Sequence, residues 1–297
     1  MLMNSYYELD PKDNHFYSIF VDVTHKCNME CANCYVPIRT VPDLDKDKLF
    51  DVLKQLPSKT EIRLIGGEPT VRTDLAEIVN QIRVLGHRPT MMTNGLMLAR
   101  PNYAKELADA GMRSIYISLN GADDDDIYLI MDGVKCAERK IKAWHECQQA
   151  KMHVNVGAIL QNDVNNHIPK RLLELSKQIG GHHILRYRNV GQIGRFSIGK
   201  NKNWNFNDLL TLICNDYGKD VSWAKNFTSI NGYKENNVVF FPMDETKKLR
   251  TTWVKITDWS PVNSDIPDPG SKRRGRLTQD FKLAPFFEHV KKYENIY

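Results

Sequence analysis

Short apolar β-type runs alternate with amphipathic helical segments through the first two thirds of the chain. The β-type runs lie at 17–23, 61–65, 88–93, 114–120, 153–160 and 183–188, and helical segments separate them at 44–56, 74–86, 103–111, about 135–150 and 168–181. Repeated βα units predict a parallel sheet with right-handed crossovers, because parallel strands cannot be joined by a tight hairpin. We therefore predict an α/β fold with its chemistry at the C-terminal ends of the strands.

The cysteines are the strongest chemical signal. There are six, at 27, 31, 34, 136, 147 and 214, and three of them lie within eight residues. The N-terminal segment lacks a signal-peptide pattern, and no stretch reaches the roughly 20 apolar residues of a membrane span. We therefore expect a cytoplasmic protein with no membrane partner, in which grouped cysteines indicate metal binding or catalysis rather than disulfides. The net charge of +5 is compatible with an anionic substrate or RNA and requires neither.

The cysteine triple directly follows the first β-type run, in the segment VDVTHKCNMECANCY. Three thiolates suit a [4Fe–4S] cluster and leave one iron with an open coordination position, which a catalytic site needs. Two alternatives remain. A zinc site would need a fourth ligand, for which His25 is a candidate, and a ferredoxin-like electron carrier would need a fourth cysteine.

With these residues and the motifs that follow them, the sequence resembles the radical S-adenosylmethionine superfamily, in particular the branch of the molybdopterin-precursor cyclase and the peptide-modifying enzymes. The resemblance runs from about residue 17 to 195. It rests on the cysteine triple, Gly66-Gly67-Glu68-Pro69, Thr93-Asn94-Gly95, Ser118-Leu119-Asn120-Gly121, Asn155 and Arg186. It implies a partial (β/α)6 barrel at 17–195, between an N-terminal segment 1–16 and a substrate-covering C-terminal extension 196–297.

The resemblance also implies cofactors and the residues that hold them. Cys27, Cys31 and Cys34 would ligate one [4Fe–4S] cluster, and S-adenosylmethionine would chelate its open iron. The implied cofactor-binding residues are Tyr35, Gly66, Gly67, Glu68, Thr93, Asn94, Ser118, Asn120, Asn155 and Arg186. The family often has Asp where Asn120 stands. An electron donor such as flavodoxin or ferredoxin is implied as partner, and the bound cluster would make the protein oxygen-sensitive.

Several of these residues also have structural interpretations from the sequence alone. Gly66 and Gly67 can admit a ligand to bare backbone or form a strand-to-helix turn. Glu68 can meet the ammonium group of the cofactor or cap the helix after Pro69. Arg186 can meet the cofactor carboxylate or lie on a strand surface.

The other motifs are weaker. The acidic run 123–126 is expected to be a solvated loop, and Cys136, Cys147 and Cys214 are too dispersed for a second cluster. Gly191, Gly194 and Arg195 are expected on the substrate rim. Four tryptophans could form a lid or a small core, at 204, 223, 253 and 259. Strands are read in 236–243 and 251–259, and the segment 260–276 reads as a loop. It contains the basic residues Lys272, Arg273, Arg274 and Arg276, which are expected to be solvated.

From the cysteine loop and the resemblance we predict an enzyme that reductively cleaves S-adenosylmethionine and abstracts hydrogen from a small-molecule substrate. A single cluster and the absence of a leader-binding module before the cysteine loop favour a small molecule. A peptide- or protein-modifying enzyme and an RNA-modifying enzyme remain alternatives, as does a non-enzymatic iron–sulfur or zinc-binding module. The catalytic residues and the fate of the substrate radical are not predicted.

Overall fold

The computed structural model describes residues 6–32, 34, 36, 39–190, 203–231, 237–247, 251–259, 273–286 and 289. Within these residues ten strands form one sheet in the order β10-β9-β1-β2-β3-β4-β5-β6-β8-β7. Adjacent strands from β9 to β8 pair in parallel, and β10 and β7 are antiparallel edge strands. The strands are β1 (Ser18–Thr24), β2 (Glu61–Gly66), β3 (Arg88–Thr93), β4 (Ser114–Ser118), β5 (His153–Leu160), β6 (His183–Asn189), β7 (Val238–Pro242), β8 (Trp253–Thr257), β9 (Arg274–Leu277) and β10 (Leu283–Pro285).

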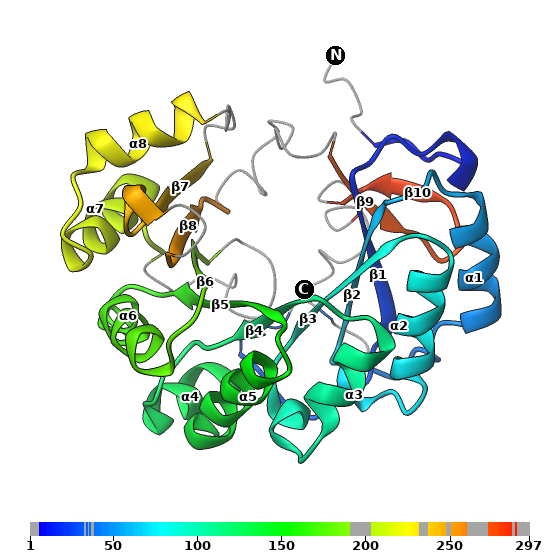
Figure 1. Ribbon diagram of the computed structural model, residues 1–297, viewed down its shortest axis with the longest axis horizontal. Coiled ribbons are helices and arrows are strands. Elements are labelled where there is room, and N and C mark those ends of the chain that lie inside the picture. The colour runs from blue at the N-terminus through cyan, green and yellow to red at the C-terminus, as the bar shows by residue number, and fades with distance from the viewer. Residues whose placement is uncertain are drawn as a thin grey trace.

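The sheet curves into an open barrel with the helices on its outer side (Figure 1). The helices are α1 (Lys46–Gln55), α2 (Leu75–Val84), α3 (Tyr103–Ala110), α4 (Asp125–Asp132), α5 (Ala137–Gln149), α6 (Ile168–Ile179), α7 (Phe206–Asp216) and α8 (Val221–Ile230). None of the described helices is long and apolar enough to cross a membrane. The predicted α/β fold, with six parallel strands joined by helices, is confirmed.

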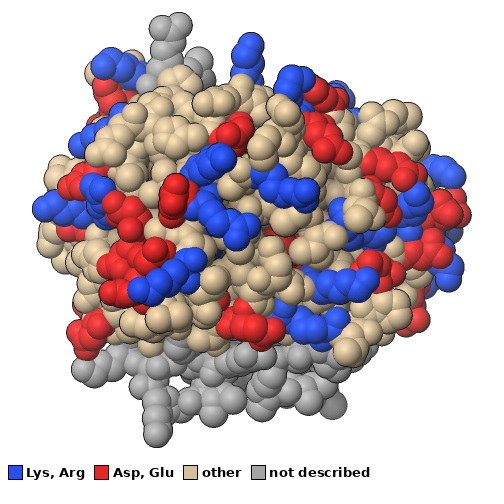
Figure 2. Space-filling view, turned by 90° about the horizontal axis from the view of Figure 1, so that it is seen from below, with Lys and Arg blue, Asp and Glu red and all other residues tan. Residues whose placement is uncertain are grey.

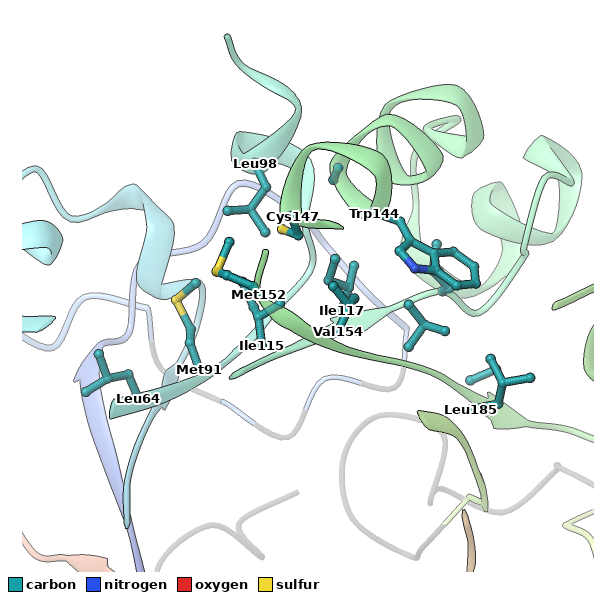
Figure 3. Close-up of a cluster of buried hydrophobic side chains, with 14 of the residues drawn as sticks. Leu64, Met91, Leu98, Ile115, Ile117, Trp144, Cys147, Met152, Val154 and Leu185 are labelled. Carbon is teal, nitrogen blue, oxygen red and sulfur yellow. The ribbon is translucent and has the colours of Figure 1, made fainter. Parts of the chain in front are cut away.

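The two faces of the strands differ because successive side chains of a strand point to opposite sides. On β2, Ile62 and Leu64 are fully buried against the helices, whereas Arg63 and Ile65 line the inner cavity. The outer layer packs against Trp144 and Cys147 of α5 (Figure 3). Each fully buried aliphatic side chain there contributes about 1.5–3 kcal/mol relative to an exposed one. The main core therefore lies outside the barrel wall, and the inside carries both polar side chains and a smaller apolar cluster of Phe20, Ile65 and Phe286.

The second half of the acidic run 123–126 begins α4, which corrects the expectation of a loop there, whereas Asp123, Asp125 and Asp126 are exposed as expected. The carboxylate of Asp124 accepts hydrogen bonds from the backbone N–H groups of Asp126 and Ile127 and so caps α4. Asp123 forms an ion pair with Arg171 of α6, and the pair lowers the pKa of Asp123. These carboxylates therefore have structural partners.

The chain beyond residue 195 extends the sheet at both of its edges. Strands β7 and β8 add to β6, as the runs at 236–243 and 251–259 predict. Helices α7 and α8, which the sparse periodicity of this region does not predict, cover this edge next to α6 and β7 (Figure 1). The sheet itself thus continues past the boundary proposed at residue 195.

Part of the segment read as a loop at 260–276 is a strand, which is a second correction. Residues 260–272, including Lys272, lie outside the described residues, but β9 pairs in parallel with β1. Arg276 is 3% exposed and its Nε donates to Asp22 over 2.7 Å, so this arginine is not solvated. A strand with the sequence RGRL has too few apolar residues to be recognised from alternation.

Candidate functional site

The cavity inside the barrel brings most of the predicted residues together. It has a volume of about 290 Å³ and is lined by side chains from the strands and from the loops that follow their C-terminal ends. The predicted residues that line it are Cys27, Cys31, Cys34, Gly66, Gly67, Glu68, Thr93, Asn94, Ser118, Asn120, Asn155 and Arg186. Tyr35 lies outside the described residues. Residues separated by more than 150 positions therefore share one pocket, which is the placement that the parallel topology predicts.

The three cysteines follow β1 in a loop that is held against the end of β2. Thr24 Oγ1 donates to Asp43 Oδ1 over 2.7 Å and accepts the backbone N–H of Lys26. The backbone N–H groups of Gly67 and Glu68 donate to the carbonyl oxygens of Thr24 and Lys26, both over 2.8 Å. These hydrogen bonds fix the start of the cysteine loop against the end of β2.

Gly66 and Gly67 are required by this contact. A Cβ at Gly66 would lie 2.1 Å from the carbonyl oxygen of Thr24, and its φ of +130° is a conformation that L residues rarely adopt. A Cβ at Gly67 would lie 2.3 Å from the carbonyl oxygen of Lys26. The paired glycines are thus needed to let the backbone of the cysteine loop approach. From the sequence we expect a ligand contact or a turn instead.

The surroundings of the cysteines suit bound thiolates. Burial raises the pKa of the Cys27 and Cys31 thiols, so their thiolates would need a bound metal or a nearby cation for stability. The Arg39 guanidinium donates from Nη2 to Cys34 Sγ over 3.3 Å, and its Nε is a buried donor without a partner in the described residues. An arginine in this place can stabilise a thiolate at Cys34.

The same residues do not suit a single zinc ion. In the part of the chain that the structure describes, no three His, Cys, Asp or Glu side chains converge closely enough to hold one metal ion. A cluster differs in this respect, because each thiolate binds a different iron. The three half-buried cysteines of one pocket therefore fit a cluster better than the zinc site considered from the sequence.

Glu68 is a buried carboxylate with four protein donors. Its Oε1 accepts from the Thr70 N–H and from the hydroxyls of Thr70 and Thr93, and its Oε2 accepts from the Asn94 N–H over 2.6 Å. Burial raises the pKa of Glu68, and these hydrogen bonds oppose the shift. The carboxylate caps the short helix Pro69–Val71 and ties the end of β2 to that of β3.

The side chain of Asn94 holds the turn after β3 and reaches the cysteine loop. Its Oδ1 accepts the Leu96 N–H, and its Nδ2 donates to Asn28 Oδ1 over 2.8 Å. Gly95 has a φ of +88°, as an Asn-Gly turn requires. The Asn94-Gly95 motif therefore forms a turn and also connects the end of β3 to the cysteine loop.

A buried ion pair that the sequence did not predict lies at the end of β4. Lys140 Nζ lies 2.8 Å from Asp132 Oδ2 and donates to the Ser118 carbonyl over 3.0 Å, and both charged side chains are at most 2% exposed. Asn120 Nδ2 donates to Asp132 Oδ1, and its Oδ1 accepts the Ile159 N–H. Asn120 thus lines the pocket, while its side-chain amide is already hydrogen-bonded to Asp132 and to the backbone of Ile159.

The cysteine loop is hydrogen-bonded to the chain next to this ion pair. The Ala32 N–H donates to the Met131 carbonyl over 3.0 Å, next to Asp132. Lys140 lies on an amphipathic helix, where a lysine ordinarily reads as exposed, so no sequence signal distinguished it. The sequence likewise gave no reason to choose Arg39.

The remaining predicted residues are distributed unevenly. Asn155 Nδ2 donates to Ser114 Oγ, and its buried Oδ1 has no partner among the described residues. Gly191, Gly194 and Arg195 lie outside the described residues. Of the four tryptophans proposed as a lid or core, only Trp259 lines the cavity; the other three pack against the hydrophobic core.

Cys136, Cys147 and Cys214 are buried away from this pocket. All three belong to the apolar core, where burial raises the pKa of each thiol, that of Cys147 to about 12. None of them lines the cavity. They behave as small core residues.

The fold and the site define a class of α/β-barrel proteins that build a metal and ligand site at the strand ends. Residues 21–175 match the Radical SAM superfamily, which is more than half of the chain, and the chain belongs to that superfamily. Its members bind S-adenosylmethionine and a [4Fe–4S] cluster. The resemblance seen in the sequence is thereby confirmed.

Individual relatives agree with this membership. The chain is 31% identical over 137 residues to a 7,8-dihydro-6-hydroxymethylpterin dimethyltransferase of Methanocaldococcus jannaschii, covering 43% of this chain and 27% of the relative. It is 32% identical over 184 residues to a probable GTP 3′,8-cyclase of Metallosphaera sedula, covering 59% and 56%. The chain thus spans between about a quarter and about half of the length of these relatives.

A solved structure shows the same fold over nearly the whole chain. Streptococcus suis SuiB bound to precursor peptide SuiA matches with a TM-score of 0.65 and 13% identity, covering 95% of this chain and 62% of SuiB. At this identity the likeness concerns the fold alone. It includes the partial barrel predicted from the sequence.

Proposed function

We propose that this protein is a radical S-adenosylmethionine enzyme that acts on a small molecule. The observation that carries the proposal is the shared pocket, in which the three cysteines meet the residues at the ends of β2, β3 and β4. A bound cluster would supply the electron that cleaves the cofactor, giving a 5′-deoxyadenosyl radical that takes hydrogen from the substrate. The protein's own contribution is to hold, orient and shield these groups.

Each part of the pocket has a role in this proposal. Cys27, Cys31 and Cys34 hold one cluster, beside the Arg39 guanidinium. The residues that would hold the cofactor are Gly66, Gly67, Glu68, Thr93, Asn94, Ser118, Asn120 and Asn155, all of which line the cavity. Glu68 would meet the cofactor's ammonium group through Oε2, which has one protein donor and can accept another.

A small substrate is supported by the size and place of the cavity. A volume of about 290 Å³ is at the lower end for ligand sites, which favours a small substrate over a large one. The face seen in Figure 2 carries Lys and Arg interspersed with Asp and Glu. The likeness to SuiB keeps a peptide substrate as the second candidate, since that protein was solved with its precursor peptide.

The experiment that tests the proposal is anaerobic reconstitution followed by iron and sulfide analysis. We expect about four of each per chain and formation of 5′-deoxyadenosine on reduction. Ala at Cys27, Cys31 or Cys34 should remove the cluster absorbance. The matched control changes Cys136, Cys147 and Cys214 together and should leave the iron content unchanged. Full cluster retention in any single ligand variant contradicts the assignment, and loss of more than half of the iron in the control indicates a second cluster.

A further inference from the structure

Two arginines converge on one tyrosine inside the barrel. The guanidinium carbons of Arg63 on β2 and Arg186 on β6 each lie 4.7 Å from the ring centre of Tyr116 on β4. Arg63 Nη2 also donates to the Tyr116 hydroxyl over 3.2 Å. Guanidinium groups at this distance are held by the electrons of the ring, so the tyrosine contacts both cations.

The strand register explains how the two side chains meet. Arg63 pairs with Thr90, which pairs with Ser114, whereas Arg186 is level with Gly157 and Ser118. Tyr116 lies between Ser114 and Ser118 on β4. Arg63 therefore reaches it from the N-terminal end of the strand, and Arg186 reaches it from the C-terminal end. The Arg186 guanidinium therefore points back into the barrel, away from the strand ends where we place the cofactor.

Glycine at position 157 permits this arrangement. A Cβ there would lie 2.5 Å from the Arg186 carbonyl oxygen and 3.0 Å from the Arg186 Cβ. Any larger residue would force β5 and β6 apart at the level of Arg186. The position of this arginine is thus set by the sheet itself.

The two arginines differ in how their charge is balanced. Arg63 forms an ion pair with Glu61, and although burial acts to lower its pKa, Tyr116 and Glu61 raise it. No ion pair to Arg186 occurs within the part of the chain that the structure describes. Its burial lowers the pKa, against the effect of Tyr116, and the nearby cations Arg63 and Arg274 lower it further. A buried guanidinium in such surroundings is stabilised by an anion.

Other basic side chains of the cavity already have partners. Of the seven Lys and Arg side chains that line it, Lys140 is paired with Asp132, Arg63 with Glu61, and Arg39 donates to Cys34. S-adenosylmethionine is a net cation at neutral pH, because its ammonium and sulfonium groups exceed its one carboxylate. The cofactor would therefore add no net negative charge beside Arg186, for which the described residues supply no ion pair.

We propose that Arg63, Tyr116 and Arg186 bind an acidic group of the substrate, a carboxylate or a phosphate. This inference rests on the function proposed above and narrows its substrate to small anionic molecules. Guanidinium forks bind both oxyanions in two-point fashion, so the shared chemistry is an oxyanion with two or more free oxygens. It replaces the role expected for Arg186 from the resemblance, in which this residue meets the cofactor's own carboxylate.

The test measures binding to the reconstituted protein at constant ionic strength. Inorganic phosphate, acetate and S-adenosylmethionine are titrated separately by calorimetry against the wild type, Arg186→Gln and the control Arg100→Gln, which changes an exposed arginine. We expect saturable phosphate or acetate binding that weakens at least tenfold in Arg186→Gln and is unchanged in the control. The stronger of the two anions identifies the acidic group. Affinity for S-adenosylmethionine should stay within about twofold.

Other results overturn the proposal. Absence of binding of both anions to the wild type, or equal binding to Arg186→Gln, rejects the anion site. A tenfold loss of S-adenosylmethionine affinity with unchanged anion binding returns Arg186 to the cofactor carboxylate. If the wild type binds anions but neither cluster nor S-adenosylmethionine, the proposed function fails while the anion site stands.

Two further variants cover a folding defect. Arg186→Lys keeps the charge but not the two-point geometry and should weaken anion binding severalfold. The double variant Glu61→Gln, Arg63→Gln removes a balanced pair and should also weaken it. Wild-type affinity in both, with intact melting curves, rejects the site.

Discussion

Arg276 on β9 donates from its Nε to Asp22 on β1 over 2.7 Å, although 254 positions separate the two residues. Their side chains are 4% and 12% exposed, so the pair is shielded from solvent where the two strands lie side by side. A second ion pair joins the same parts of the chain, between Lys282 and Asp10, and is about half exposed. The two contacts permit a direct comparison of buried and exposed charge pairs.

We predict that Arg276→Met lowers the free energy of unfolding by about 3–5 kcal/mol, because it leaves Asp22 charged and buried. Lys282→Met, the control, should cost much less, because solvent screens its exposed ion pair with Asp10. Urea unfolding of the two variants measures both values. Equal losses would mean that burial does not distinguish the pairs.

Lys140 and Asp132 allow a second test of buried charge. Lys140→Met should destabilise the protein by about 3–5 kcal/mol, since Asp132 is then left without its cation. Adding Asp132→Asn should recover part of this loss, because the amide remains a hydrogen-bond partner for Asn120. Unfolding of the single and double variants gives the comparison, and a double variant less stable than Lys140→Met would contradict it.

Glu68→Gln separates the cofactor role of this residue from its structural one. Loss of the charge weakens hydrogen bonds to a charged acceptor, so we expect about 1–3 kcal/mol lower stability in a thermal melt. If Glu68 also meets the cofactor ammonium, affinity for S-adenosylmethionine falls by roughly 10- to 150-fold, which is the outcome we predict. Glu106→Gln, at an exposed position, is the control. Lower stability with unchanged affinity would restrict Glu68 to capping.

His183 gives the folded protein a defined pH dependence. Its Nε2 donates to the Gly180 carbonyl and its Nδ1 accepts from Trp144 Nε1 over 3.2 Å, so a second ring proton would face the indole N–H. Burial lowers the pKa of His183 from 6.5 to about 4. The unfolded chain then binds more protons between these values, and stability is lost as the pH falls through this window.

From pH 7 to pH 5 this histidine alone should remove about 2 kcal/mol of stability. His183→Gln should remove that part of the pH dependence, whereas the control His182→Gln, at the exposed neighbouring position, should retain it. Urea unfolding of the cluster-free protein at the two pH values provides the measurement. An unchanged difference between the pH values in His183→Gln would show that other groups produce it.

The sequence predicts the strands and helices that carry the pocket because their signals are local. Six apolar runs and five helical periods are visible in the residues themselves, and a parallel sheet then places Cys27, Glu68 and Asn94 at one end. Strand β9 is not visible, because RGRL is held by pairing with β1 and by a distant carboxylate rather than by apolar alternation. Helix α4 is not predicted from the sequence either, because its start depends on the cap supplied by Asp124.

Some pocket residues could be predicted from the sequence and others could not. Cysteine spacing predicts a metal site, but Arg63 and Tyr116 lie inside strands, where a polar residue ordinarily marks a solvent-facing side. Only the closure of the sheet turns that side into a cavity wall. The need for glycine at 66 and 67 also depends on contacts with the backbone of residues 24–26.

The pairing of β9 with β1 has a consequence for how the protein is made. Strand β1 emerges from the ribosome early, yet the partner on one of its edges follows only after about 250 further residues. Contacts of such long sequence separation form late and slowly, and until then that edge of β1 offers unpaired N–H and C=O groups to other chains. A chain whose synthesis has not yet passed β9 therefore leaves this edge open to aggregation. Slower translation between β8 and β9 should lower the yield of soluble protein.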